Sequence, residues 1–455
     1  MTTMTPLTIY GEKIMKQTEF KRRRKHLLNH IGKGNIALIA SASMCARNSD
    51  VDYPFRQNSD FYYLTGFNEP EALAVFVPGR TEGEYLLFCR KYDKKKALWE
   101  GAHAGLEGAL SLYDADTAHA IDEVDELLPK LLENKTKVFY PMGRDTELDQ
   151  RLQNWFHLIR NQSRTGVEAP SEIVSLEHQL HEMRLFKSTN EIKLMRHAAE
   201  VSAIAHSKAM QSCKAGRYEY QIEADIVHHF MDNGLRAVAY PSIVASGKNA
   251  CTLHYTENTG LLKEGDLLLI DAGAECDHYA ADITRTFPIS GKFSEPQKQL
   301  YQLVLDAQTA ALAQIKPGIP WNKAHEASVE VITEGLIALG LLKGKLKKLI
   351  KDEKYKQFYM HRIGHWLGMD VHDVGAYKVT QEWRLLEKGM VLTVEPGLYI
   401  PADCKEVEKK WRGIGIRIED DVLITAEGHE ILTAGVPKTI SEIEALMQDT
   451  NATRI

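Results

Sequence analysis

The sequence predicts an α/β (α+β) protein with two domains, one over residues 1–187 and one over residues 188–455. Three observations support this fold class. Strand-like apolar runs alternate with helix-like stretches up to about residue 185, a helix-start signal follows at Ser188, and glycine and short apolar runs dominate from Gly234 onward. At roughly 150 residues per domain, a chain of 455 residues has room for two or three domains.

The amino-terminal domain is expected to contain a sheet. Its strand-like runs are Ile36 to Ala40, Ala72 to Val77, Tyr85 to Cys89 and Lys137 to Tyr140. The basic run KRRRKH, from Lys21 to His26, precedes Leu27, Leu28 and Ile31. We interpret this run as the solvated face of an amphipathic helix rather than as a patch that binds nucleic acid.

The second domain is expected to open with a long helix. Ser188 followed three residues later by Glu191 is a capping box, which satisfies two free backbone donors at a helix start. Apolar residues then recur at helical spacing. Further strands are predicted at 266–271, 390–395 and 415–422, and helices at 295–315 and 322–340.

Two segments of the second domain resemble each other. GDLLLIDAG (265–273) and GMVLTVEPG (389–397) both place an acid after an apolar run that follows glycine. A histidine precedes both copies, His254 and His365, and a second acid follows both, Asp282 and Glu419. The domain is therefore interpreted as two related halves around one shared site.

The acids of these segments predict a metal site. A carboxylate that ends a buried strand is costly unless its charge is compensated. If residues 275–278 form a turn, antiparallel pairing places Asp271 opposite Asp282, with Cβ atoms about 4.5–5.5 Å apart. Glu395 and Glu419 make a second pair. Four inward acids with a histidine predict a binuclear site, in which paired metals activate a water.

Three histidines cluster in MHRIGHWLGMDVHDVG, namely His361, His365 and His372. The zincin motif HExxH is ruled out because Arg362 stands where its glutamate would be. Neutral imidazole binds Mn, Co or Zn, and histidines that do not bind metal can donate hydrogen bonds to a developing oxyanion. His254 lies among small polar residues and is expected to face the same cavity.

Composition argues against several other classes. A net charge of −6 is unlike the basic excess of nucleic-acid-binding proteins. No apolar window approaches the length of about 18 residues that a membrane helix needs, and the first residues lack the apolar core of a secretory signal. Six scattered cysteines without a CxxC pair are typical of reduced thiols, so a cytoplasmic location is expected. Nucleophile elbows (GxSxG) and phosphate loops are also absent from the sequence.

These motifs together resemble the metal-dependent proline peptidases, most closely the bacterial-type Xaa-Pro aminopeptidases (aminopeptidase P). The family signature HxxGHxLGxxVHD is HRIGHWLGMDVHD here, and ASGKNACTLHY, LLLIDAGAE, YAADITRTFP, VLTVEPGLYIP and WRGIGIRIEDDVLIT also look like family segments. Upstream, RQNSDFYYLTGFNEPEA resembles the family's amino-terminal domain and HEMRLFKSTNEI its linker helix. The resemblance covers nearly the whole chain. It implies a creatinase-type α/β domain followed by a pita-bread catalytic domain with pseudo-twofold halves.

The resemblance also implies roles for particular residues. The metal ligands would be Asp271, Asp282, His365, Glu395 and Glu419, with Asp282 and Glu419 bridging two ions. The catalytic residues would include His254, His361, His372, Glu395 and Arg417, and Tyr399 would support the substrate. Trp99 and Arg164 look like residues that close the substrate cleft.

One segment departs from the family pattern. GAYKVTQEWRLLEKG, between His372 and Glu395, is one residue longer than expected. An arginine often present there is matched only loosely by Arg384, which leaves the outer substrate contact open.

The implied enzyme is an exopeptidase that removes the amino-terminal residue when proline is second, by attack of a metal-bridging hydroxide. Proline's tertiary amide makes a dedicated pocket physically sensible. Two divalent ions, most often Mn(II), and a homodimer or homotetramer are expected, with no nucleic-acid or membrane partner. A prolidase, which cleaves Xaa-Pro dipeptides, is the nearest alternative. A non-catalytic pita-bread binding module and a metal-free creatinase-like enzyme both predict lost acids, whereas all five ligands are present.

Overall fold

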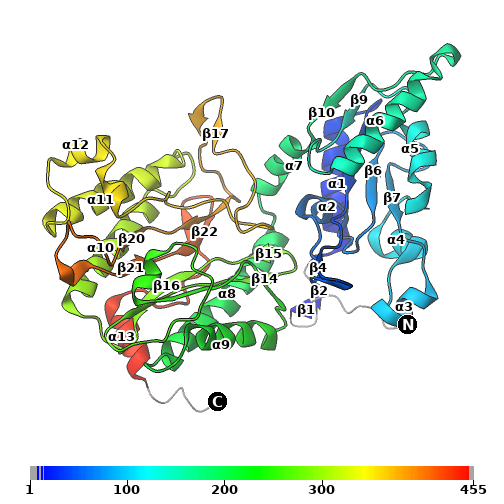
Figure 1. Ribbon diagram of the computed structural model, residues 1–455. Helices are drawn as coiled ribbons and strands as arrows, with labels where there is room; N and C mark the ends of the chain where they lie inside the picture. The colour runs from blue at the N-terminus through cyan, green and yellow to red at the C-terminus, as the bar shows by residue number, and fades with distance from the viewer. Residues whose placement is uncertain (1–7, 10–11, 14, 450–455) are drawn as a thin grey trace. The chain divides into compact units, whose positions relative to one another are not determined.

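The computed structural model describes residues 8–9, 12–13 and 15–449, which divide into two compact units, one up to Arg184 and one from Leu185 (Figure 1). No helix in this described part of the chain has both the length and the apolarity needed to cross a bilayer.

The amino-terminal unit is built on a six-stranded mixed sheet. Its strand order is β10-β9-β3-β6-β7-β8. The parallel pairs are β10 with β9, β9 with β3, and β7 with β8, and the other neighbours are antiparallel. The strands are β3 (Ile36–Ala40), β6 (Leu73–Phe76), β7 (Tyr85–Cys89), β8 (Thr117–Ala120), β9 (Lys137–Phe139) and β10 (Glu172–Val174). The four strands predicted in this region are confirmed, β3 and β7 residue for residue.

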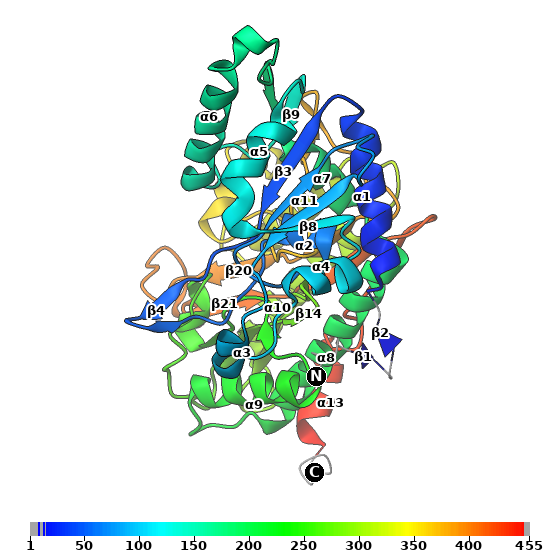
Figure 2. The ribbon, with the colours of Figure 1, turned by 90° about the vertical axis from the view of Figure 1, so that its right-hand side faces the viewer.

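Helices cover both faces of this sheet (Figure 2). One face packs against α5 and α6 in an apolar core that includes Leu38, Phe88, Leu128 and Trp155. The helices are α1 (Gln17–Ile31), α2 (Ser59–Thr65), α3 (Lys94–Glu100), α4 (Gly105–Tyr113), α5 (Val124–Leu132), α6 (Thr146–Arg160) and α7 (Leu176–Leu185). Two short hairpins complete the unit, β1 (Thr8–Ile9) with β2 (Glu12–Lys13) and β4 (Ala46–Asn48) with β5 (Val51–Asp52).

The basic run KRRRKH lies on α1 as predicted, but the expectation that all of it is solvated is wrong. Arg23 and Arg24 are 1% and 3% exposed. Their guanidinium groups lie over the rings of Tyr63 and Tyr85 and donate to the carbonyl oxygens of Tyr63 and Leu64. An arginine can be buried at little cost when its stem packs on apolar surface and its donors are satisfied, and sequence spacing alone does not reveal these partners.

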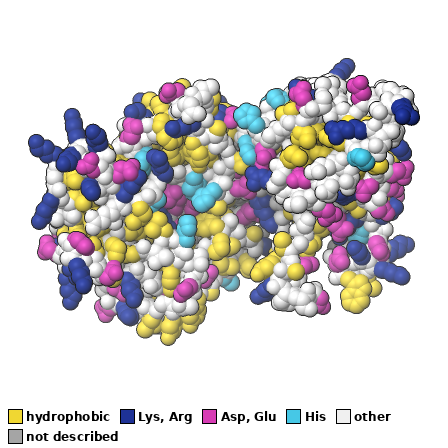
Figure 3. Space-filling view, turned by 45° about the horizontal axis from the view of Figure 1, so that its top comes forward, with side chains coloured by type: hydrophobic (Ala, Val, Ile, Leu, Met, Phe, Trp, Pro, Cys, Tyr) yellow, Lys and Arg dark blue, Asp and Glu magenta, His cyan; other side chains and the backbone are white. Residues whose placement is uncertain are grey.

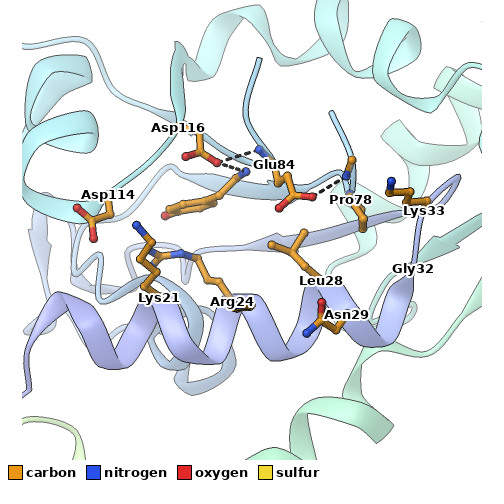
Figure 4. Close-up of a pocket in the computed structure, with 13 residues that line it drawn as sticks. Lys21, Arg24, Leu28, Asn29, Gly32, Lys33, Pro78, Glu84, Asp114 and Asp116 are labelled. Atoms are coloured by element: carbon orange, nitrogen blue, oxygen red, sulfur yellow. Dashed lines mark hydrogen bonds between the residues drawn. The ribbon is translucent and has the colours of Figure 1, made fainter. Parts of the chain in front are cut away.

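A cavity of about 480 Å³ lies beside α1 (Figure 4). Lys21, Lys25 and other residues of α1 line it, together with Glu84 and Asp116. Asp116 accepts hydrogen bonds from the backbone N–H groups of Glu84 and Tyr85, and Glu84 accepts one from Gly79. Glu84 and Asp116, two acids that line this cavity, therefore stabilise the β6–β7 turn and the start of β8.

The carboxy-terminal unit opens with α8 (Thr189–Ser212), and the predicted capping box of Ser188 and Glu191 is present at its start. Each half of this unit is a helix pair followed by antiparallel strands. The first half contains α8, α9 (Glu219–Asp232), β11 (Ala237–Val238), β12 (Ile243–Ser246), β13 (Leu267–Asp271), β14 (Ala274–Cys276), β15 (Tyr279–Ala280) and β16 (Thr284–Pro288). Strand β13 is central, between β12 and β16.

The second half repeats this plan. Helices α10 (Glu295–Leu312) and α11 (Asn322–Ala338) confirm the two helices predicted at 295–315 and 322–340, and they pack against each other. Its remaining elements are α12 (Leu346–Lys351), β17 (Lys378–Val379), β18 (Glu382–Trp383), β19 (Val391–Val394), β20 (Gly397–Ile400), β21 (Ile414–Arg417), β22 (Asp420–Ile424), β23 (His429–Ile431) and α13 (Ile440–Gln448). Strand β19 pairs with β22, and β20 with β21.

Two details of the predicted strands are wrong. Asp271 pairs with Thr284, not with Asp282. The turn is centred on Asp277 and His278, which both have left-handed φ angles (47° and 70°), and this shifts the register by two residues. Asp282 becomes a diagonal neighbour of Asp271, still within reach of a carboxylate.

The predicted strand 415–422 is also interrupted. It forms β21 and β22, which pair with different strands, and Ile418 and Glu419 lie between them. The Glu419 N–H donates to the carbonyl of Thr284, in the other half. The break therefore directs Glu419 toward the acids of the first half.

Candidate metal centre

A cavity of about 540 Å³ lies within the carboxy-terminal unit, and both halves line it. Its first-half residues include Tyr240, His254, Asp271 and Asp282; its second-half residues include His361, Arg362, His365, His372, Glu395, Arg417 and Glu419. In the space-filling view, histidine and acidic side chains gather on this unit's visible face (Figure 3).

The four acids come from corresponding places in the two halves. Asp271 ends β13 and Glu395 directly follows β19, while Asp282 precedes β16 and Glu419 precedes β22. Three of them are 2–8% exposed. Because apolar strands carry them into the interior, their charges meet where water cannot screen them.

This crowding is visible in the acid–base properties. Burial and the charges of Asp282, Glu395 and Asp271 raise the pKa of Glu419 well above its usual value. Burial, only partly offset by the positive charges of His365 and Arg417, raises the pKa of Glu395 to about 7. A divalent cation among these oxygens would relieve the repulsion, so the donor set fits a metal.

His365 is oriented as a metal-binding imidazole. Its Nδ1 lies 3.0 Å from the Trp366 carbonyl, and its Nε2 lies 3.4 Å from Asp282 and 3.7 Å from Glu395. Because Nδ1 donates to that carbonyl, Nε2 is the ring nitrogen that faces the acids, and a metal ion would bind there in place of a proton. Ligand atoms of Asp282, His365 and Glu419 all lie within 4.8 Å of one another, close enough for one ion.

Gly364 explains the fixed position of His365. A Cβ at Gly364 would lie 1.9 Å from the carbonyl oxygen of Thr393 in β19, so only glycine fits. The His365 N–H donates to the Thr393 hydroxyl, and the Thr393 N–H donates to the His365 carbonyl. The motif HRIGH is thus bound to the strand that leads to Glu395.

A chain of hydrogen bonds connects Asp271 to His361. Arg417 donates to Asp271 at 2.6 Å and to the Tyr399 hydroxyl at 3.0 Å, and this hydroxyl lies 2.9 Å from Nε2 of His361. Burial and the charge of Arg417 lower the pKa of His361 to about 3. His361 is therefore neutral at physiological pH and can accept or donate a hydrogen bond.

His254 and His372 lie at the rim of the cavity. Both are exposed, and the rings of His365 and His372 are 4.3 Å apart in an edge-on arrangement. The loop that carries His254 is tied to Glu219 at the start of α9. This buried carboxylate accepts from Ser246, Asn249, Tyr255 and Gly260, on both sides of His254.

Sequence reasoning missed two residues of the site. The Tyr240 hydroxyl lies 2.6 Å from both Asp271 and Asp282, and the Thr284 hydroxyl donates to Glu419 and accepts from Arg417. No signal near Tyr240 marks it, because it lies 31 residues before Asp271. Thr284 could have been found, since it lies two residues after Asp282 in YAADITRTF, at the start of β16.

Three other candidates are not among the residues that line this cavity. Trp99 in α3 and Arg164 belong to the amino-terminal unit, where Trp99 is 86% exposed. Arg384 is 9% exposed and lies over the ring of Phe186, and it is not among the residues that line the cavity.

Comparison with known proteins gives the family. The model of metallopeptidase family M24 matches residues 193–426, and that of the aminopeptidase P amino-terminal domain matches residues 20–140. An Xaa-Pro aminopeptidase of Escherichia coli K12 is 44% identical over 434 residues, covering 95% of this chain and 98% of that protein. The chain belongs to the Xaa-Pro aminopeptidases of metallopeptidase family M24.

Solved structures of the family share the fold. Pseudomonas aeruginosa aminopeptidase PepP superposes with a TM-score of 0.94 at 55% identity, covering 95% of this chain and 98% of that one. Zn-substituted E. coli aminopeptidase P in complex with product gives 0.92 at 44% identity and the same coverage. The carboxy-terminal unit is thus an M24 pita-bread domain, which follows an aminopeptidase P amino-terminal domain along the chain, as the resemblance implies.

Proposed function

We propose that this protein releases the amino-terminal residue from peptides with proline in second position. The observation that carries the proposal is the meeting of four carboxylates and His365 from both halves in one cavity. Relatives that match nearly the whole chain are Xaa-Pro aminopeptidases, which favours this activity over that of a prolidase.

The metal site is proposed to hold two divalent ions. Asp282 and Glu419 would bridge them, His365 and Glu395 would hold one, and Asp271 the other. A set of one imidazole and four carboxylates suits Mn(II), which we propose as the native ion. When bound, such ions polarise a carbonyl oxygen and lower the pKa of a water.

The chain's own residues would then move the protons. The Glu395 carboxylate takes a proton from the attacking water and delivers it to the proline nitrogen as the C–N bond breaks. Proline's amide nitrogen carries no hydrogen, so this delivery completes a secondary amine leaving group. His254 and His372 at the rim donate to the carbonyl oxygen as it gains charge, while Arg417 and Tyr399 hold His361 against the substrate.

Further parts of the proposal concern the whole molecule. The domains are proposed to meet at residues 187–188, with Trp99 and Arg164 of the first contributing to the substrate cleft. We also propose a cytoplasmic homodimer or homotetramer.

The activity is tested with three peptides that share one amino-terminal residue: an Xaa-Pro-Xaa tripeptide, the Xaa-Pro dipeptide and an Xaa-Ala-Xaa tripeptide. Cleavage of the first alone supports the proposal. Preference for the dipeptide would indicate a prolidase, and cleavage of the alanine peptide at an equal rate would refute proline specificity.

The binuclear site is tested by Asp282→Asn and Glu419→Gln. A neutral amide is a poor bridge between two cations, so both variants should lose most bound metal and nearly all activity while remaining folded. Metal content by elemental analysis is read beside circular dichroism. Full metal occupancy with ordinary turnover in either variant contradicts the assignment.

A further inference from the structure

The charges that line the catalytic cavity are unevenly distributed. Four are carboxylates, and the arginines are Arg362 and Arg417. Arg417 is 4% exposed and bonded to Asp271 at 2.6 Å, so its charge is already compensated. Arg362 is exposed, and no acid of the described residues forms an ion pair with it.

Arg362 is held by a short hairpin. Its guanidinium lies 5.7 Å from the ring centre of Trp383 in β18, within the range of a cation–π contact. The Trp383 ring stacks on Trp321, with centres 5.8 Å apart. At the hairpin tip, Thr380 and Gln381 have left-handed φ angles of 48° and 71°, the pattern of a tight two-residue turn. This hairpin lies within the segment that is longer than the family pattern.

The charges that line the cavity would orient a bound peptide. A short peptide has a positive amino terminus and a negative carboxyl terminus. The amino terminus is drawn to the buried acids, which repel the carboxylate at the other end. The uncompensated cation of this cavity is Arg362, which adjoins His361 beside the acids.

We propose that Arg362, held over Trp383, binds the carboxy-terminal carboxylate of short peptides and makes them the preferred substrates. This inference rests on the proposed function and specifies its substrate class. A planar guanidinium suits the role because it can donate two parallel hydrogen bonds to a carboxylate.

The test compares an Xaa-Pro-Xaa tripeptide with its carboxy-terminal amide, by kcat/KM of the metal-loaded full-length enzyme. An ion pair in a partly exposed setting should favour the free acid by about 2- to 5-fold. Arg362→Ala should reduce this ratio to about one, and Arg362→Lys should retain part of it because the charge remains. Extending the peptide by several residues should remove the preference of the wild type, since the carboxylate then lies beyond Arg362.

A matched control is Lys378→Ala. Lys378 also lies over Trp383, with Nζ 4.7 Å from the ring centre, but it is not among the residues that line the cavity. This variant should keep the wild-type ratio. An unchanged ratio in Arg362→Ala, or no preference in the wild type, overturns the assignment of Arg362. Absence of cleavage of both tripeptide forms by the wild type would instead refute the proposed function.

Discussion

Glu219 offers a sharp test of how the fold supports the site. Its carboxylate is 0% exposed and accepts five hydrogen bonds: three at Oε1, from the Ser246 N–H and hydroxyl and from Asn249, and two at Oε2, from the Tyr255 hydroxyl and the Gly260 N–H. Glu219→Gln keeps the shape but replaces one acceptor by an NH2 group.

The magnitude follows from which donors lose their acceptor. If the amide oxygen replaces Oε1, the new NH2 faces Tyr255 and Gly260. The tyrosine hydroxyl can rotate and accept, but the Gly260 N–H cannot, and a buried unpaired donor costs about 1–3 kcal/mol. Weakening the remaining charge-assisted bonds adds about 1 kcal/mol. The total of about 2–4 kcal/mol corresponds to a fall in Tm of about 4–16 °C for a unit of this size.

The assay is thermal unfolding beside steady-state kinetics. Because the loop tied to Glu219 carries His254, kcat should fall, whereas metal content should stay near the wild-type value. Glu223→Gln is the matched control: this residue, one turn along α9 and half-buried, accepts one side-chain bond, from Asn258. If Glu219→Gln melts within about a degree of the control, the carboxylate does not hold this loop as argued.

Two further predictions concern the histidines and a buried ion pair. His365→Ala should lower metal content, measured by elemental analysis. His254→Ala and His372→Ala should keep the metal and lose about 100- to 1000-fold in turnover, because each removes one proposed oxyanion donor. Loss of metal in His254→Ala with retention in His365→Ala would reverse the assignment. Lys187→Met removes the ammonium 2.9 Å from buried Asp373 and should destabilise the unit by about 3–5 kcal/mol in denaturant unfolding. Adding Asp373→Asn should recover part of this loss, and no recovery would show that the charge of Asp373 is not its cause.

Much of the fold could be predicted because its signals are local. The strand β13 begins with the uninterrupted apolar run LLLI, and the start of α8 is a capping box of two residues three apart. The acids at strand ends are likewise visible, since a carboxylate after LLLI or VLTV is costly without a partner. Such features need no knowledge of what packs against them.

The remaining features depend on tertiary contacts. Arg24 is buried because the ring of Tyr85, 61 residues away, lies beneath its guanidinium, and no spacing rule anticipates this. The predicted partner of Asp271 was wrong because the turn is centred one residue later than expected, on Asp277 and His278. Neither residue is a glycine, so the sequence does not mark the position of this turn. Tyr240 lies in a separate loop, and its hydroxyl contacts both Asp271 and Asp282.

The site also explains why its two halves must fold together. The first half supplies two acids and His254, and the second supplies two acids and His365, so neither half holds the whole proposed ligand set. The bonds that join them lie directly at the site: the Glu419 N–H donates to the Thr284 carbonyl, and Arg417 donates to Asp271. Arg417 therefore has two effects at once, since it offsets the charge of a first-half acid and fixes the strand that leads to Glu419. Any ion bound between these acids would stabilise the same contact, because a ligand that binds only the folded state stabilises it by mass action.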